Sequence, residues 1–143
     1  MGNEIKGSLV MRKVLVDSDV VIDFLRQPKK ETLLRLLLED KKKKIFIAAV
    51  SITELWKGKS IEKKEKRQKV ERFLKKVKLV VADRKISQQA GDLLRKYPFL
   101  MLGDSLVAAT CLVKGFRLAT FNEKHFKEIK NLKFYSAEWK RGK

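Results

Sequence analysis

Cysteine and histidine are almost absent from this 143-residue chain, which contains one of each, Cys111 and His125. A single cysteine excludes an internal disulfide framework and is typical of a reducing compartment, and its place in the apolar run SLVAATCLV predicts a core residue. Structural zinc sites use about four Cys or His ligands, so a zinc centre is excluded. His125 has no nucleophile motif around it, and we expect a surface residue of a short helix.

Long hydrophobic runs are also missing. No apolar segment approaches the roughly 20 residues that a transmembrane helix needs. The first residues, MGNEIKGS, lack the apolar segment of a signal peptide, and Lys6 stands where a myristoylation signal has Ser or Thr. We therefore expect a cytoplasmic protein with no membrane contact.

Acidic residues are scarce relative to basic ones. The chain has 35 Lys and Arg against 17 Asp and Glu, a formal net charge of +18. Such an excess favours a polyanionic partner, because basic side chains that neutralise phosphates release condensed counterions. The alternative is the Lys-rich surface of a thermophile protein, but Glu does not keep pace with Lys here.

Apolar patterns along the chain predict strands that alternate with helices. Residues 1–12 are polar and indicate a flexible tail. We expect strands over 13–16, 45–50, 78–83 and 117–121, with a candidate fifth, edge strand over 132–136, and helices over 18–26, 31–40, 51–58, 61–77, 85–97, 104–114 and 122–129. Gly115 is the expected C-cap of the helix over 104–114. The run 45–50 lacks polar alternation, as parallel strands buried on both faces do. The expected fold is α/β, a three-layer α/β/α sandwich with a mostly parallel central sheet, in a single domain over 1–143.

Four polar residues, Asp17, Glu54, Asp104 and Asn122, follow short apolar runs or begin apolar helices. In a parallel α/β sheet the carboxyl ends of the strands face one crevice, so these side chains can meet there. Clustered oxygen ligands suit a hard divalent cation such as Mg²⁺. Each residue taken alone also fits a helix cap: Asp17, Asp104 and Asn122 as N-caps, and Glu54 in a capping box with Ser51.

The joint order of these pieces is more specific than any one of them. VLVDSDVVIDFLR, SITELWKG, GDSLVAATCLVKGFRLATFN and NEKHF resemble the four motifs of PIN-domain ribonucleases of the VapC type, the toxin half of a toxin–antitoxin pair. The resemblance covers residues 13–135. It implies an endoribonuclease that uses Mg²⁺ or Mn²⁺, an RNA substrate, a homodimer, and a VapB-like antitoxin that blocks the acidic site.

Carried over to this chain, the resemblance implies that Asp17, Glu54 and Asp104 bind the metal and that Asn122 occupies the fourth position. Asp19 stands where relatives often have Asn, so it either adds charge to the cluster or holds the turn. Glu123, beside Asn122, is an alternative ligand. Thr120 matches a small polar position of the fourth motif, and Asp23 matches an acidic position of the first motif, where we interpret it as a supporting residue.

The basic helix expected over 61–77 has two interpretations. Residues 62–78 contain nine Lys or Arg and three Glu, so the charge is mostly of one sign. We expect Lys63, Lys66 and Lys69 to contact the RNA backbone, with a solvated charged face as the alternative. Two other functions stay open: a PIN nuclease of RNA processing without an antitoxin, and a non-catalytic basic RNA-binding protein. For an antitoxin helix, we expect the apolar surface of ETLLRLLLED, Leu55 and Trp56 to form the docking site.

Overall fold

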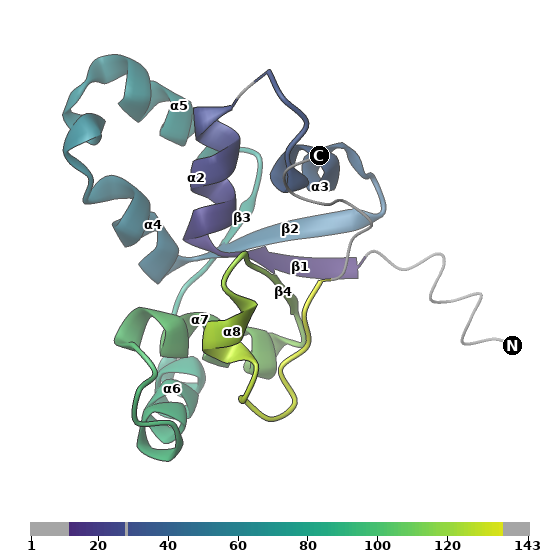
Figure 1. Ribbon diagram of the computed structural model, residues 1–143, viewed down its shortest axis with the longest axis vertical. Helices are drawn as coiled ribbons and strands as arrows, with labels where there is room; N and C mark the ends of the chain where they lie inside the picture. The colour runs from purple at the N-terminus through teal and green to yellow at the C-terminus, as the bar shows by residue number, and fades with distance from the viewer. Residues whose placement is uncertain (1–11, 28, 136–143) are drawn as a thin grey trace, which may run out of the picture.

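A four-stranded parallel sheet lies between two layers of helices in the computed structural model, which describes residues 12–27 and 29–135 (Figure 1). The strands are β1 (Arg12–Val16), β2 (Lys43–Ala48), β3 (Lys78–Val80) and β4 (Arg117–Ala119). Their order in the sheet is β3-β2-β1-β4, and each neighbouring pair is parallel. The expected parallel α/β sandwich is therefore confirmed.

The central strand β1 shows why the sheet is covered on both faces. Val14, Leu15 and Val16 are all fully buried. Val14 and Val16 pack into the core on one face, and Leu15 packs into the core on the other. Because successive side chains of a strand point to opposite faces, a run of apolar residues without alternation needs helices on both sides.

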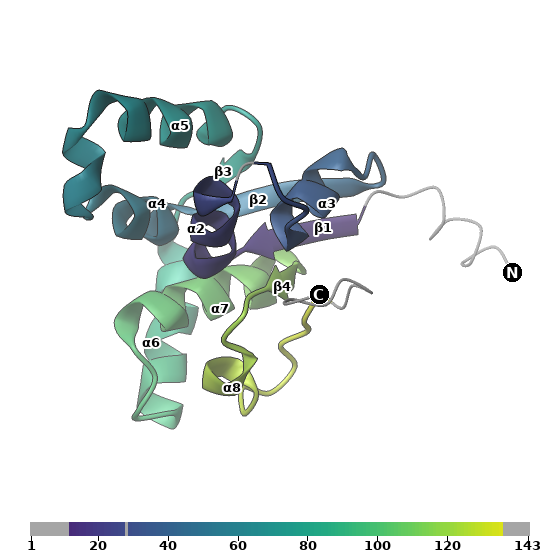
Figure 2. The ribbon, with the colours of Figure 1, turned by 45° about the horizontal axis from the view of Figure 1, so that its top comes forward.

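The first helical layer contains α2 (Ser18–Arg26), α3 (Leu33–Glu39) and α5 (Lys64–Leu74), and the second contains α6 (Arg84–Lys96), α7 (Leu102–Lys114) and α8 (Glu123–Phe126). Figure 2 shows the first set above the sheet and the second below it. The helix α4 (Ala49–Trp56) leaves the end of β2 and touches both cores, through Leu55 on one side and Val50 on the other. The 3₁₀ helix η1 (Lys59–Glu62) joins α4 to α5.

Several element boundaries differ from those expected. The strand expected over 45–50 covers 43–48, because Ala49 and Val50 already belong to α4. The helix expected over 61–77 starts only at Lys64, after η1, and ends at Leu74. The third strand ends at Val80 rather than at residue 83. The candidate fifth strand is reduced to one parallel bridge between Leu118 and Phe134, and Ser136 lies outside the described residues.

Other expectations about local structure hold. Gly115 ends α7 with a φ of 74°, the left-handed conformation that glycine adopts without steric cost. Cys111 is buried in the core of the second layer. Of the expected tail, residues 1–11 lie outside the described residues and Arg12 is the first residue of β1. Within the part of the chain that the structure describes, no helix has the length and apolar character needed to cross a membrane.

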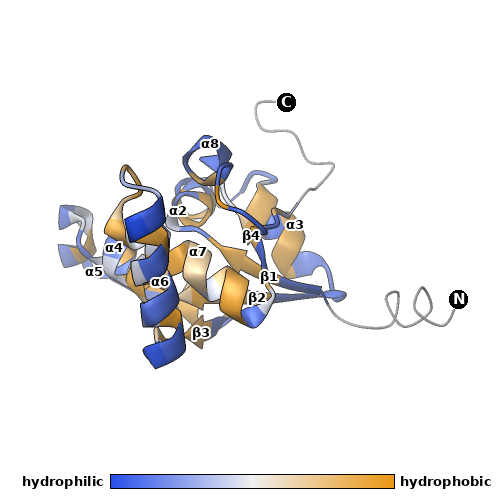
Figure 3. Cartoon of the chain, turned by 90° about the horizontal axis from the view of Figure 1, so that it is seen from below, coloured by the Kyte–Doolittle hydropathy of each residue, from blue (hydrophilic) through white to orange (hydrophobic). Residues whose placement is uncertain are grey.

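The prediction that ETLLRLLLED, Leu55 and Trp56 form an apolar docking surface for a partner helix is largely wrong. Leu33, Leu34 and Leu37 of α3 and Leu55 of α4 are buried in the protein's own core. Figure 3 shows by hydropathy that α3 is mostly apolar and that α6 carries many polar residues. Trp56 keeps an exposed fraction of 38%, and among residues 12–27 and 29–135 the other large apolar residues that are mainly exposed are 79, 81, 99, 101 and 102.

Strand order also locates a crevice. From β1 the chain proceeds through β2 to β3 on one side, and β4 joins β1 on the other side. The order of the strands thus reverses at β1, and ligands of open α/β sheets bind at the carboxyl ends of the strands beside such a reversal.

Candidate active site at the carboxyl edge of the sheet

Asp17 is the first residue after β1 and lies at the reversal point. It is 6% exposed, and its backbone N–H donates to Ala119 at the end of β4. Its Oδ1 accepts a hydrogen bond of 2.9 Å from the backbone N–H of Ser18, so the predicted N-cap of α2 is confirmed. Its Oδ2 accepts a second bond of 2.9 Å from the hydroxyl of Thr120. The residue therefore caps a helix and faces the crevice at once.

Asp19 accepts hydrogen bonds from the segment that follows β4. Its Oδ2 accepts from the backbone N–H of Phe121 at 3.1 Å and from the side-chain amide of Asn122 at 3.2 Å, with the Thr120 hydroxyl at 3.4 Å. Asn122 occupies the N-cap position of α8 but makes no side-chain cap bond, so its capping role is not confirmed. Its side chain instead joins the acidic cluster, as the family resemblance implied for the fourth position.

Glu54 reaches the same cluster from α4. Its Oε1 accepts a hydrogen bond of 2.9 Å from the hydroxyl of Ser18. The predicted capping box with Ser51 is wrong, because α4 already begins at Ala49 and Ser51 lies fully buried within the helix. A Cβ added at Gly103 would lie 3.2 Å from Glu54 Oε2, so the carboxylate approaches the first turn of α7 closely. Neither Ser18 nor Gly103 was singled out from the sequence as a contact of Glu54.

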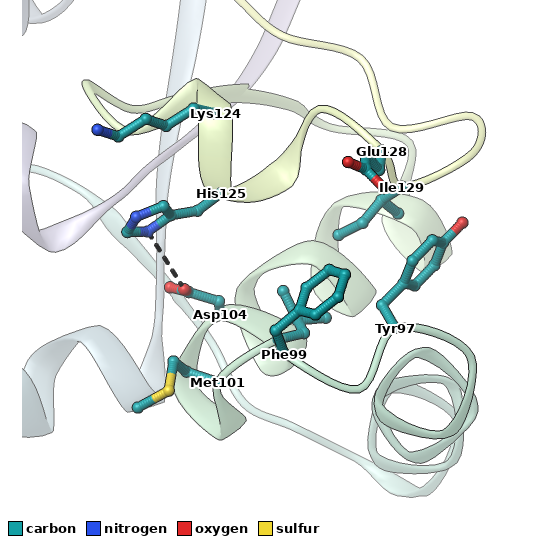
Figure 4. A pocket seen from close by; sticks show the side chains of 9 residues that line it. Tyr97, Phe99, Met101, Asp104, Lys124, His125, Glu128 and Ile129 are labelled. Carbon is teal, nitrogen blue, oxygen red and sulfur yellow. Dashed lines mark ion pairs between the residues drawn. The ribbon is translucent and has the colours of Figure 1, made fainter.

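Asp104 is in the first turn of α7, whose N-cap is Met101, so the predicted capping role of Asp104 is also wrong. The carboxylate is half-buried, and its Oδ2 lies 3.9 Å from Nδ1 of His125 (Figure 4). His125 is exposed on α8 as expected, but nothing in the sequence indicated that it faces Asp104. A negative charge in the first turn is favourable there because the helix N-terminus carries a partial positive charge.

The carboxylates share one electrostatic environment. The pKa of Asp17 is raised to about 7, first by burial and then by the negative charges of Asp19 and Asp104, against the hydrogen bonds from Thr120 and Ser18, which lower it. Burial also raises the pKa of Asp104, with Glu54 adding to the rise and His125 opposing it. In residues 12–27 and 29–135, no Lys or Arg nitrogen lies within 4.0 Å of the carboxylates of Asp17, Glu54 or Asp104. This edge is thus acidic in a strongly basic protein.

The acidic side chains do not surround a single point in the described structure. Glu54 turns to Ser18, and Asp104 turns to His125. Among the described residues, no group of three His, Cys, Asp or Glu is placed to hold a metal ion. Two further candidates are less central: Glu123 is exposed on α8, and Asp23 accepts a bond of 2.8 Å from the side chain of Gln27, within its own helix.

The basic residues proposed for RNA lie apart from this edge. Lys63 is the N-cap residue of α5, and Lys66 and Lys69 belong to that helix, with Lys63 and Lys69 exposed and Lys66 half-buried. In Figures 1 and 2, α5 lies on the far side of α2 and α4 from α7 and α8. This helix therefore does not border the acidic edge, and contact between these lysines and RNA stays a prediction.

The fold and this acidic edge define a PIN-type α/β domain, and comparisons with known proteins agree. The family model described as "PIN domain" matches residues 14–132. Ribonuclease VapC10 of Mycobacterium tuberculosis is 36% identical over 126 residues, which cover 84% of this chain and 90% of the relative. The chain therefore belongs to the PIN-domain family and, within it, to the VapC proteins, as the sequence motifs indicated.

Solved structures show the same fold. A chain of VapBC2 from Rickettsia felis, bound to a DNA fragment from its promoter, aligns with a TM-score of 0.72 at 21% identity and covers 88% of this chain and 99% of the other. A chain of DNA-bound VapBC from Salmonella typhimurium aligns with the same TM-score at 19% identity and covers 87% and 98%. The described architecture is thus that of VapBC components in other organisms.

Proposed function

We propose that this protein is an endoribonuclease that cleaves RNA phosphodiesters and acts as the toxin of a VapBC-type toxin–antitoxin pair. The observation that carries the proposal is that Asp17, Glu54, Asp104 and Asn122 all lie at the edge where the strand order reverses and that the acids among them influence one another's pKa values. These are the residues that the VapC motifs specify, and the relative at 36% identity is named a ribonuclease. A net charge of +18 suits an RNA substrate.

We infer that Asp17, Glu54 and Asp104 bind Mg²⁺ or Mn²⁺, with Asn122 at the fourth position. The donor chemistry fits, because carboxylate and amide oxygens are the ligands of hard cations. The acids also repel one another, and among the described residues no Lys or Arg nitrogen lies within 4.0 Å of these three carboxylates. Glu54 and Asp104 must turn away from Ser18 and His125 for this. When bound, such an ion lowers the pKa of a coordinated water and stabilises charge on the phosphodiester.

The residues of the chain itself prepare this edge for a cation. Thr120 and the backbone N–H of Ser18 fix both oxygens of Asp17, and the pKa of about 7 leaves part of the Asp17 population protonated at neutral pH. A cation at this edge would favour the ionised form and release that proton. Asp19 fixes Asn122 and the backbone after β4, so it acts as a positioning residue in this proposal.

The proposed partner is a VapB-like antitoxin, because the solved structures that share this fold include VapBC complexes. An inserted Arg or Lys of that partner would meet the acidic edge and compensate its charge. Homodimerisation is proposed on the family resemblance alone. An RNA-processing nuclease would share the site and lack the antitoxin.

Incubation of the purified protein with total RNA tests the function. Cleavage is expected with Mg²⁺ or Mn²⁺, and none with excess EDTA. If added metal restores cleavage after EDTA treatment, then EDTA acted by removing the metal and not by unfolding the protein. Binding without cleavage under every metal condition would support a non-catalytic RNA-binding protein instead.

A further inference from the structure

A cavity of about 310 Å³ opens directly beside Asp104. It lies between the segment that joins α6 to α7 and the region of α8 (Figure 4). Leu100 and Ile129 are its buried apolar lining residues, while Asp104 and Glu128 bring acidic groups to the cavity and Lys124 and His125 bring basic ones. The cavity therefore combines an apolar interior with charged groups at the proposed site of cleavage.

Phe99 is the most unusual residue of this cavity, because its exposed fraction is 78%. A fully packed Phe would bury most of its apolar surface. Met101 and Leu102, a few positions along the chain, are also exposed, at 70% and 65%. In Figure 4 the Phe99 ring lies between Asp104 and Tyr97, and side chains from the α8 region face it across the cavity.

The backbone holds Phe99 in place. Pro98 and Phe99 are the central residues of a turn closed by a hydrogen bond of 3.0 Å from the Leu100 N–H to the Tyr97 carbonyl. Pro98 restricts the backbone φ of that turn. The hydroxyl of Tyr97 accepts a bond of 3.2 Å from the backbone N–H of Lys130, which ties the turn to the segment after α8. An exposed ring on a fixed turn is a ready surface for stacking.

We propose that this cavity binds one unpaired nucleobase of the RNA strand, stacked on Phe99 next to the phosphodiester cleaved at Asp104; this rests on the proposed function. Proteins that bind single-stranded RNA combine aromatic rings that stack on bases with cations that meet the backbone. Phe99 supplies the ring, and Lys124 and His125 supply groups that can pair with phosphate.

Binding of a short single-stranded oligoribonucleotide in EDTA tests the proposal without cleavage. One base of the oligonucleotide is replaced by 2-aminopurine, whose fluorescence is quenched by stacking. Phe99→Ala should weaken binding by about 5- to 150-fold, the range for loss of one base–aromatic stack, and should abolish the quenching. Phe99→Trp should preserve both. Leu102→Ala is the matched control, because Leu102 is 65% exposed nearby and does not line the cavity.

An abasic position in the oligonucleotide supplies the second half of the test. Loss of the stacked base should weaken binding to the wild type and have little further effect on Phe99→Ala. Equal RNA affinity of wild type and Phe99→Ala would overturn the proposal. So would a Phe99→Ala variant that binds RNA normally but loses self-association or binding of a protein partner, since the ring would then belong to a protein interface. Because EDTA prevents metal-dependent cleavage, failure of the proposed ribonuclease activity would be seen separately, in the assay with metal.

Discussion

The hydroxyl of Thr120 donates a hydrogen bond of 2.9 Å to Oδ2 of Asp17, across 103 positions of the sequence. This bond joins the end of β4 to the end of β1, beside the backbone bond from Asp17 N–H to the Ala119 carbonyl. The buried carboxylate is therefore held by two strands that come from opposite ends of the chain. The pKa of Asp17 should therefore change if the contact between the ends of β1 and β4 is lost.

The metal-free protein should lose stability as the pH rises from 5.5 to 8. The pKa of Asp17 is about 7 in the folded state against 3.8 for the free side chain, so the folded state binds more protons between these values. Stability is then highest below the lower pKa and falls as the pH passes the higher one. The loss should be on the order of 2 kcal/mol between pH 5.5 and 8.

Denaturant unfolding in EDTA at both pH values measures this difference. Asp17→Asn should remove most of it, since the amide does not titrate. A wild type that is equally stable at the two pH values would show that burial does not raise the pKa of Asp17 as described. The raised pKa of Asp104 acts in the same direction, so a residual dependence in the variant is expected.

Gly103→Ala should reduce cleavage while the protein stays folded. The added Cβ would lie 3.2 Å from Glu54 Oε2 and would displace a carboxylate proposed to bind metal. Alanine is the better helix former by about 1 kcal/mol, so stability should not fall much. Gly91→Ala in α6 is the matched control, because a Cβ there meets nothing within 4 Å. It should stabilise the protein and leave cleavage unchanged; full activity of Gly103→Ala would argue against a role for Glu54.

Replacement of Lys63, Lys66 and Lys69 by Gln should weaken RNA binding and reduce its salt dependence. Each lost contact with a single-strand phosphate lowers the log–log slope by about 0.7. Stability should change little, because Lys63 and Lys69 are exposed and Lys66 is only half-buried. Since α5 lies away from the acidic edge, these contacts would involve RNA distant from the cleaved bond. A control with Gln at Lys29, Lys30 and Lys41, all exposed, removes the same charge; equal slopes for the two triple variants would make α5 an ordinary solvated surface.

Expression of this chain alone in a bacterial host should arrest growth, and Asp104→Ala should relieve the arrest. The product of a short adjacent gene should bind the protein and inhibit cleavage, because uncontrolled cleavage of cellular RNA requires restraint. Growth curves together with co-purification measure both effects. Harmless high-level expression of active wild type would leave an RNA-processing nuclease as the better function.

The covered parallel sheet could be predicted because apolar runs without alternation require two covering layers. The acidic edge could be predicted because polar residues follow these runs, at the carboxyl ends of the strands. The sequence could not decide whether Glu54 and Asp104 cap helices or belong to the acidic site, since both interpretations fit the same local pattern. Only the start of α4 at Ala49 and of α7 at Leu102 removes their capping roles.

Contacts between distant segments were beyond prediction for a different reason. The approach of His125 to Asp104 and of Gly103 to Glu54 depends on how helices of separate segments pack, which no local pattern records. The same limit explains the leucines of α3: their number indicated an apolar face, but not that the face is covered by the protein's own core.

Single-turnover cleavage of RNA by wild type, Asp104→Asn and Asp92→Asn, each with Mg²⁺ or Mn²⁺ and with EDTA, tests the central claim most directly. Asp92 is an exposed acid of α6 paired with Arg95 at 2.8 Å, so its variant removes a carboxylate that is not among the proposed site residues. Metal-dependent cleavage should persist in Asp92→Asn and fall by roughly 100-fold or more in Asp104→Asn, the effect of losing one electrostatic contributor to a transition state. Equal cleavage rates for Asp104→Asn and the wild type, or undiminished cleavage in EDTA, would contradict a metal-dependent ribonuclease centred on this edge.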